Sequence, residues 1–339
     1  MQEEEMRMEG RSDRAGPGGA GSPPVREWSV SVVIPSYNIR DYIGRTLRSV
    51  LDQTVRPLEI LVVDDGSTDG TGDVAGGYPA PVRVIRQTNA GPSGARNTGI
   101  LAARGEFVAL LDGDDEWRPR HLENAMRVFG TCPHLQWHSC GYKRRTERRT
   151  IYTRVIPREY LGGKPFVEDF FPPQARWTFC CSDTVVARRG LFDEVGLFDT
   201  VIPFGEDMDL WFRIALRHPR VGYCPEVTAI WWVREGSLSA AFPRTAPVLV
   251  GFAERYTRMA AEAGPEALRR CRPLVAKWLA TAVKVACKNG PPDILRTIAD
   301  RYGQWISPEL RWFCRLTPPR LLRSIAGVKT RLKAFRMRM

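Results

Sequence analysis

Long apolar segments are missing from this sequence of 339 residues. A helix that crosses a bilayer needs roughly 18 or more consecutive apolar residues, and no stretch of the chain reaches that length. The residues before Trp28 are rich in Glu, Gly, Pro and Ser and lack the apolar centre of a secretory signal. We therefore expect a cytoplasmic protein. Its basic C-terminal end leaves peripheral association with the inner face of the plasma membrane open.

Cysteine pairs with C-x-x-C spacing are missing as well. None of the eight cysteines forms a C-x-x-C pair, although such spacing is usual in zinc sites and redox centres. Cys132, His134, His138 and Cys140 lie near one another in the sequence, but their spacing is wider than zinc sites use. We expect reduced, mostly buried thiols, which are typical of a cytosolic protein.

Acidic residues are in deficit, with 38 Asp and Glu against 50 Lys and Arg, and the formal net charge is +12. A GC-rich genome that encodes arginine in place of lysine would give this excess without any function. Alternatively, the charge attracts anionic surfaces such as phospholipid headgroups or acidic glycans. No nucleic-acid recognition motif accompanies it, so we expect no nucleic-acid partner.

Changes in pattern along the chain predict three regions. Residues 1–27 are polar and rich in Gly and Pro, which predicts a disordered tail. Residues 28–240 alternate short apolar runs with helical periodicity, which predicts an α/β domain. Residues 241–339 contain only helical patterns and end in a basic amphipathic stretch. The expected fold is a Rossmann-like, mostly parallel sheet flanked by helices, with a C-terminal helical appendage.

The expected elements follow from the spacing of apolar residues and from turn residues. Arg144 to Arg149 reads as a solvated turn, and residues 150–178 as an irregular insertion. The strands expected with most support are residues 30–35, 58–63, 82–86 and 107–111, and the helices are residues 41–51, 93–103, 119–129 and 206–216.

Carboxylates follow two of the expected strands directly. Asp64 and Asp65 come after the run Leu58 to Val63, and Asp112 and Asp114 come after Phe107 to Leu111. In open α/β sheets ligands bind beyond the carboxyl ends of the strands. Carboxylates there can hold a hydroxylated ligand and a hard cation such as Mg²⁺, which completes its coordination with phosphate oxygens and water. The sequence therefore predicts a site for a metal-bound nucleoside diphosphate.

For several further residues the sequence supports both a binding role and a structural alternative. Tyr37 follows Pro35 at the end of the first strand, where its ring can stack on a base or cap the core. Asp65 can accept a hydrogen bond from a base, whereas Asp64 and Asp65 can also cap the next helix. Arg96 and Asn97 lie early in an expected helix. They can bind an anion there, because helix N-termini favour negative charge, or they can be ordinary surface residues of a capped helix.

Five motifs in fixed order carry a resemblance to a known family. They read SVVIPSYN (31–38), ILVVDDGSTD (60–69), NAGPSGARN (89–97), LLDGDD (110–115) and GEDMDLW (205–211). Together they resemble the family 2 inverting glycosyltransferases, which have the GT-A fold. The resemblance covers roughly residues 29–240.

The resemblance implies roles for individual residues. Asp112, in the family's DxD motif, would contact the ribose, and Asp114 would hold Mg²⁺ or Mn²⁺. Asp207 would be the base that accepts the acceptor proton, with Glu206 and Asp209 as supporting or solvated carboxylates. Alternatively, acidic residues at this helix start only complement the helix dipole. The role of Asp115 stays open: it could support the neighbouring site residues or cap the helix near Pro119.

The sequence departs from the family near its end. Where relatives often have an arginine and a histidine before Gly-Ser-x-Ser, this chain has Trp232 and Arg234. Arg234 can still bind the departing diphosphate, because a guanidinium suits phosphate oxygens.

The resemblance implies a metal-dependent, inverting glycosyltransferase that uses a UDP- or GDP-type sugar. Its acceptor would be a glycan or lipid-linked hydroxyl in the synthesis of cell-surface polysaccharide, lipopolysaccharide or glycolipid. A catalytically silent protein that binds nucleotide sugars or glycans on the same fold is the main alternative. Residues 318–339 alternate arginines with apolar residues, which suits either a helix on an anionic membrane or an ordinary packing helix.

Overall fold

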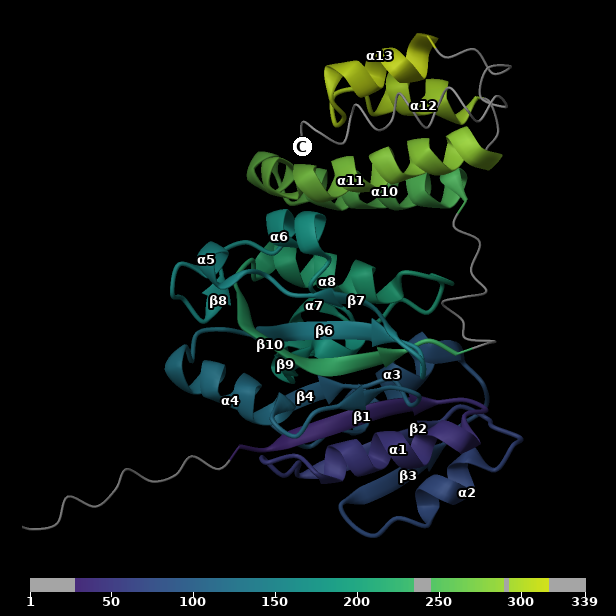
Figure 1. Cartoon of the computed structure of the whole chain (residues 1–339), viewed down its shortest axis with the longest axis vertical. Helices are drawn as coiled ribbons and strands as arrows, with labels where there is room; N and C mark the ends of the chain where they lie inside the picture. Colours follow the sequence, from purple (N-terminus) through teal and green to yellow (C-terminus); the bar gives the residue numbers. More distant parts are fainter. Residues whose placement is uncertain (1–27, 235–244, 290–292, 317–339) are drawn as a thin grey trace, which may run out of the picture.

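A single mixed sheet forms the centre of the computed structural model, which describes residues 28–234, 245–289 and 293–316 (Figure 1). Its strands follow the order β3-β2-β1-β4-β9-β6-β10-β5. In addition, β7 pairs with β6, and β8 pairs with β10. The strands are β1 (Val30–Ser36), β2 (Glu59–Asp64), β3 (Val82–Arg86), β4 (Phe107–Leu110), β5 (Glu116–Trp117), β6 (Trp137–Arg145), β7 (Thr150–Arg154), β8 (Phe166–Val167), β9 (Val186–Arg188) and β10 (Val221–Trp232).

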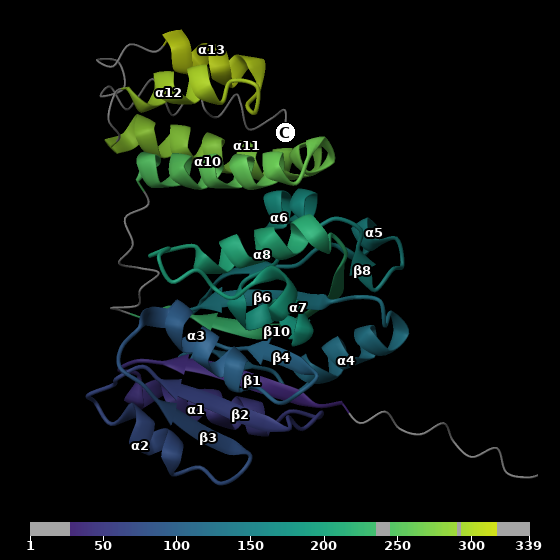
Figure 2. The ribbon, with the colours of Figure 1, turned by 180° about the vertical axis from the view of Figure 1, so that it is seen from behind.

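Helices connect most of the strands and cover both faces of the sheet (Figures 1 and 2). In the first half they are α1 (Arg40–Leu51), α2 (Thr71–Gly76), α3 (Gly91–Ala102), α4 (His121–Thr131), α5 (Arg158–Leu161) and α6 (Phe171–Trp177). In the second half they are α7 (Gly190–Val195), α8 (Glu206–Arg217), α10 (Ala246–Glu262), α11 (Pro265–Asn289), α12 (Ile294–Arg301) and α13 (Pro308–Leu316).

The parallel strands bring the predicted acidic loops to one edge. β1 pairs in parallel with β2 and with β4, and Ser36 lies opposite Asp64 at the end of the ladder. All residues of β2 and β4 are buried, which explains their continuous apolar runs. The carboxyl ends of β2 and β4 therefore place Asp64, Asp65 and Asp112 on the same side of the sheet.

The structure corrects two expectations about residues 144–178. Arg144 and Arg145 belong to β6, and the turn comprises residues 146–149. Residues 150–178 are not irregular, because they form β7, α5, β8 and α6. β7 pairs with β6 alone among the described strands, so one edge of it faces solvent and its sequence carries little apolar alternation. Antiparallel pairing of β5, β7, β8 and β9 makes the sheet mixed rather than uniformly parallel.

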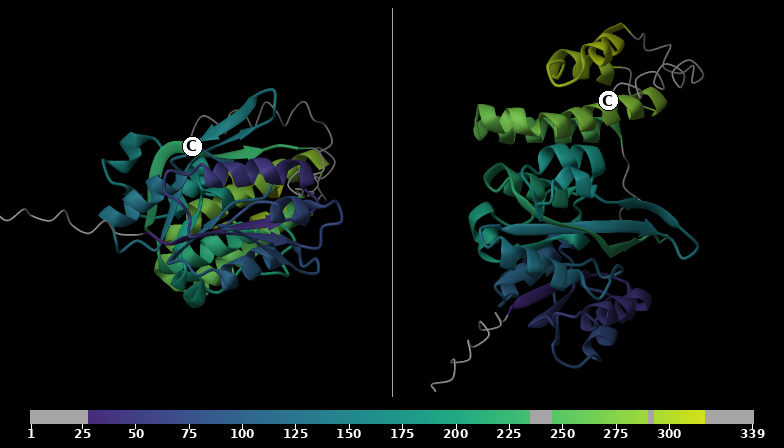
Figure 3. Two further views of the ribbon diagram at one scale, coloured as in Figure 1. Left: turned by 90° about the horizontal axis from the view of Figure 1, so that it is seen from below. Right: turned by 60° about the vertical axis from the view of Figure 1, so that its left-hand side comes forward.

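The C-terminal helices pack onto the α/β core instead of standing apart from it (Figure 3). The ring of Tyr256 in α10 stacks on Phe212 of α8, with the centroids 4.5 Å apart. One cluster of buried apolar side chains extends from Val33 in β1 to Cys314 in α13. A second cluster lies on the opposite sheet face, under α1 and α4. Side chains of α10 to α13 therefore share a buried cluster with the sheet domain, and the division near residue 240 stays a prediction.

Some predictions concern residues outside the described part of the chain. These are the disorder of residues 1–27 and the basic amphipathic helix of residues 318–339. Within the described part, no helix combines the length and the apolar character that crossing a bilayer requires.

Candidate active site

Hydrogen bonds join the loops after β1 and β2. The backbone N–H of Asn38 donates to Ser67 Oγ (3.0 Å), and Asn38 Oδ1 accepts from the N–H of Thr68 (2.9 Å). Asn38 has a φ of 50°, a backbone conformation that asparagine tolerates better than most residues. The preceding Tyr37 is 50% exposed. Its ring is therefore available at the sheet edge, next to the partly buried Pro35.

Asp64 and Asp65 have different partners. Asp64 Oδ1 accepts from the N–H of Ser67 at 3.1 Å within the loop, which is not the helix cap considered for this pair, because α2 begins at Thr71 and has no side-chain cap. Asp65 Oδ1 accepts from Gln87 Nε2 (2.7 Å) and from the N–H of Ala90 (2.8 Å). Asp65 thus fixes the loop that leads into α3, and its use as a contact to a base stays a prediction.

A buried arginine joins two acidic segments that lie far apart in the sequence. Arg96 in α3 donates to Asp112 Oδ1 at 2.7 Å and to Glu206 Oε1 at 2.8 Å. Burial by itself would lower the pKa of Arg96, but the two carboxylates outweigh it and raise that pKa above its ordinary value. Arg96 therefore stays charged and connects the loop after β4 to the start of α8.

We expect Arg96→Met to destabilise the protein by about 3 kcal/mol, because it leaves two partly buried carboxylates without their partner. Urea unfolding of the purified variant measures the change. Arg120→Met is the matched control, since Arg120 is exposed and its pair with Glu123 is of a kind worth less than about 1 kcal/mol. Equal losses in both variants would show that the Arg96 contacts do not stabilise the fold.

Asn97 is engaged by the chain itself. Its Nδ2 donates to the carbonyl of Phe198 (2.9 Å), and its Oδ1 accepts from the N–H of the same residue (2.9 Å). Both ends of the amide therefore hold the loop between α7 and α8. A contact between Asn97 and the donor, expected from its place in the helix, would have to replace one of these hydrogen bonds.

The residues that replace the family's arginine and histidine meet the loop after β4. Arg234 Nε pairs with Asp114 Oδ2, and the backbone N–H of Trp232 donates to Asp115 Oδ1 at 2.7 Å. Asp115 is therefore a partner for the end of β10 rather than a cap for α4. Gly113 allows this loop to lie against β1, because a Cβ there would come within 2.9 Å of the carbonyl oxygen of Pro35.

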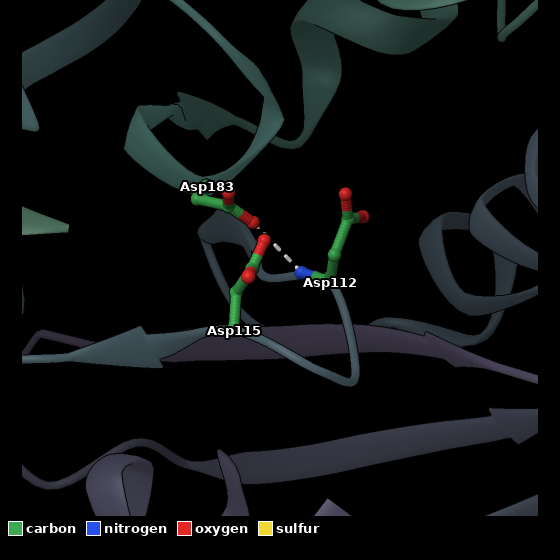
Figure 4. A group of neighbouring side chains, drawn as sticks. All are labelled: Asp112, Asp115 and Asp183. Atoms are coloured by element: carbon green, nitrogen blue, oxygen red, sulfur yellow. Dashed lines mark hydrogen bonds between the residues drawn. The ribbon is translucent and has the colours of Figure 1, made fainter. Parts of the chain in front are cut away.

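Three carboxylates gather beside this loop: Asp112, Asp115 and Asp183 (Figure 4). One oxygen from each lies within 4.8 Å of the others. Burial and the adjacent carboxylates raise the pKa of Asp183 to about 7 and hold the pKa of Asp115 well above its ordinary value. A hard cation would relieve this concentration of negative charge, so the donor set fits Mg²⁺ or Mn²⁺. Asp114, the metal ligand implied by the resemblance, is not in the group but lies in the same loop.

Asp183 was not found by sequence reasoning. It lies in a short 3-10 turn (Ser182–Thr184) before β9 and follows no apolar strand. Its Oδ1 accepts from the N–H of Asp112 at 2.9 Å, and its carbonyl accepts from Trp117 Nε1 at 2.7 Å. These contacts span about seventy residues of sequence, and no local pattern marks them.

Asp207 lies at the start of α8. Gly205 precedes the helix with a φ of 79°, in the left-handed region that favours glycine. The N–H of Met208 donates to Asp207 Oδ1 at 2.7 Å. Burial, followed by the negative charge of Glu206, raises the pKa of Asp207 to about 7. A carboxyl with such a pKa can accept a proton near neutral pH.

The first C-terminal helix holds this segment in place. Arg255 in α10 donates to Asp209 Oδ1 (2.5 Å) and to Asp199 Oδ2 (2.9 Å). Asp209 also accepts from Arg213, whose guanidinium donates to three backbone carbonyls at the end of α7 and in the loop after it. Asp209 is thus a structural partner of α10, and α10 contributes to the position of Asp207.

The loops after β1, β2 and β4 and the start of α3 lie in a segment that matches a known family. The sequence model of "Glycosyl transferase family 2" matches residues 31–196. Residues 31–196 belong to glycosyl transferase family 2. The family 2 match includes Tyr37, Asp65, Arg96, Asp112 and Asp114, and it ends before α8 and the end of β10.

Relatives and solved structures agree with this assignment. The chain is 32% identical over 216 residues to the succinoglycan biosynthesis protein ExoO of Rhizobium meliloti, covering 62% of each chain. The matching segment spans about half the length of other curated relatives. TarS 1–349 of S. aureus with UDP-GlcNAc gives a TM-score of 0.67 at 21% identity, over 85% of this chain and 87% of that one.

A more distant structure shares the same architecture. The mannosyltransferase PcManGT from Pyrobaculum calidifontis, in complex with GDP-Man and Mn2+, has a TM-score of 0.53 at 20% identity and covers 91% of this chain and 88% of that one. These structural likenesses show the GT-A-type fold of the family 2 domain, including its central sheet and flanking helices. They confirm the fold class expected from the sequence.

Proposed function

We propose that this protein is an inverting, metal-dependent glycosyltransferase that moves a hexosyl group from a nucleotide sugar to a hydroxyl. The observation that carries the proposal is the half-buried Asp207, whose pKa is about 7, beside the Arg96 network at the ligand edge of the sheet. Family membership and the raised pKa together favour transfer over the alternative, a silent protein that binds nucleotide sugars or glycans.

In this proposal Asp207 accepts the proton of the acceptor hydroxyl as its oxygen attacks the anomeric carbon. A single displacement of this kind inverts the configuration at that carbon. Asp112 and Tyr37 would contact the nucleoside, and Arg234 would move from Asp114 to the diphosphate. A divalent cation held by Asp114 with the cluster beside it would neutralise charge on the leaving diphosphate.

UDP- and GDP-linked sugars are the proposed donors, since structural neighbours were solved with UDP-GlcNAc and with GDP-Man. A glycan or lipid-linked acceptor in cell-surface polysaccharide synthesis is proposed from the relative named for succinoglycan biosynthesis. Peripheral membrane association through residues 318–339 stays part of the proposal.

A panel of nucleotide sugars tests the proposal. The purified protein is incubated with each donor and with Mg²⁺ or Mn²⁺, and release of the nucleoside diphosphate is measured. We expect slow hydrolysis of one donor class, abolished by chelation. Tight donor binding without release of diphosphate, also in the presence of glycan acceptors, would favour the silent binding protein.

We also expect the rate of transfer to depend on pH through Asp207. Because the pKa is raised to about 7, the carboxylate form that accepts a proton is lost as the pH falls through 7. The value of kcat/KM should fall about tenfold for each pH unit below the pKa. Initial rates between about pH 5.5 and 8.5 measure this, with circular dichroism to confirm folding. A rate that stays constant down to about pH 5.5 contradicts the role of Asp207.

A further inference from the structure

One face at the end of the sheet carries arginines and aromatic rings, and none of the described carboxylates pairs with these arginines. Tyr142 and Arg144 alternate along β6 and therefore point to the same face. In the ladder to β7, Tyr142 lies opposite Arg154 and Arg144 lies opposite Tyr152. On its other side Arg144 lies next to Trp231 of β10. The register thus brings side chains from three strands to one surface.

The guanidinium groups lie over aromatic rings. The guanidinium carbon of Arg144 is 4.4 Å from the ring centroid of Trp231, and that of Arg154 is 4.4 Å from the centroid of Tyr152. The ring of Tyr152 in turn meets that of Tyr142 edge to face, with 6.4 Å between centroids. Contacts of this kind orient a guanidinium without neutralising its charge.

Both arginines have unused hydrogen-bonding capacity. The Nε atoms of Arg144 and Arg154 are buried without a hydrogen-bond partner. Within residues 28–234 and the described helices, neither side chain forms an ion pair with a carboxylate. An unpaired buried N–H costs free energy unless a ligand or water accepts from it. The two groups are therefore suited to an anionic ligand.

A lysine adds a third cation. Lys277 Nζ donates to Thr178 Oγ1 at 2.6 Å, and the carbonyl of Thr178 accepts from the hydroxyl of Tyr142 at 3.0 Å. Burial and the charge of Arg154 lower the pKa of Lys277 to about 8. We call Arg144, Tyr152, Arg154, Trp231 and Lys277 together the arginine–aromatic surface.

The arginine–aromatic surface lies beside the candidate active site. Lys277 Nζ donates to the carbonyl of Gln174 at 3.3 Å, and Gln174 Nε2 contacts the sulfur of Met208, the residue after Asp207, at 3.2 Å. At the other end of the surface Trp231 precedes Trp232, whose backbone N–H donates to Asp115 Oδ1 at 2.7 Å. The surface is thus adjacent to the proposed base.

We propose that the arginine–aromatic surface binds an acidic glycan, as the acceptor that is presented to Asp207. This inference rests on the proposed function. Aromatic rings provide stacking area for sugar rings, and the guanidinium groups bind carboxylates attached to those rings. A lipid headgroup would need charge alone, whereas here the guanidinium carbons of Arg144 and Arg154 each lie 4.4 Å from the centroid of an aromatic ring.

Binding of defined saccharides tests the inference without any need for transfer. Titration calorimetry of the full chain uses an oligogalacturonate, a neutral maltooligosaccharide of the same length and a linear polyphosphate of the same charge. We expect the oligogalacturonate to bind at least about tenfold more tightly than either other probe. Equal binding of the maltooligosaccharide, or equal binding of the polyphosphate, would overturn the proposal.

Matched double variants locate the site. Arg144→Gln with Arg154→Gln should weaken oligogalacturonate binding about tenfold or more. Arg148→Gln with Arg149→Gln removes the same charge from the exposed turn of the same hairpin and should change it less than about twofold. Equal weakening by both pairs would overturn the proposal.

A further variant and a measurement of nucleotide binding distinguish failure of this inference from failure of the proposed function. Arg154→Lys keeps the charge but loses the planar guanidinium, so we expect intermediate weakening; full affinity would count against the guanidinium contact. Binding of UDP and GDP is measured on every variant. Unchanged nucleotide binding with lost saccharide binding supports the acceptor surface, while absence of nucleotide binding in the native protein would count against the proposed function alone.

Discussion

Asp207→Asn is expected to reduce transfer by about a thousandfold while leaving the fold and the binding of the donor nucleotide intact. The amide keeps the size of the carboxylate but cannot accept the proton of the acceptor hydroxyl, and general bases contribute roughly a hundred- to ten-thousandfold to such steps. Initial rates of transfer, or of diphosphate release where no acceptor is known, measure the effect.

Two controls accompany this variant. Asp193→Asn removes an exposed carboxylate of α7 and should retain the full rate. Thermal unfolding checks that Asp207→Asn is folded. This substitution should also raise stability slightly near neutral pH, because the native carboxyl has a pKa above its ordinary value and is therefore destabilised in its charged form. A rate within a few-fold of the native protein would remove Asp207 from the mechanism.

Asp114→Asn is expected to abolish the dependence of donor binding on metal. Loss of this carboxylate removes the proposed anchor of the cation, so the affinity for UDP or GDP in the presence of Mn²⁺ should fall at least about tenfold. Calorimetry with and without chelator measures it. The native protein should lose the same affinity when the metal is chelated.

Asp52→Asn, at the exposed end of α1, is the control for charge and should bind the nucleotide like the native protein. Two results would argue against a metal at Asp114. One is native binding that ignores the chelator. The other is an Asp114→Asn variant that still responds to the chelator, which would shift the anchor to the group of Asp112, Asp115 and Asp183.

The parts of the fold that the sequence predicted are those in which local patterns and burial coincide. β1, β2, β4 and α8 are either continuously buried or amphipathic, so their apolar spacing reflects their environment. β5 has two residues and depends on pairing with the distant β10, and β7 is a partly exposed strand that pairs with the neighbouring β6, so no local pattern marks either of them. The charged residues Arg144 and Arg145 were expected in a turn for the same reason.

The residues of the candidate site also differ in whether a local sequence pattern marks them. Asp112, Asp114 and Asp207 follow a strand or open a helix, so their position in the sequence indicates their place at the sheet edge. Asp183 comes to the site only through the topology of the sheet. The contacts of Arg96 with Asp112 and Glu206 could not be predicted either, because they join segments separated by 16 and 110 residues.

The ion pair between Arg234 and Asp114 couples the binding of a cation at Asp114 to the binding of a diphosphate. A cation that arrives alone has to displace a guanidinium, which is left without an anion. A cation that arrives with a diphosphate gives Arg234 a new anionic partner, so each ligand increases the affinity for the other by the same factor. Metal and nucleotide should therefore bind as a pair, and the free protein should resist loading by stray divalent ions.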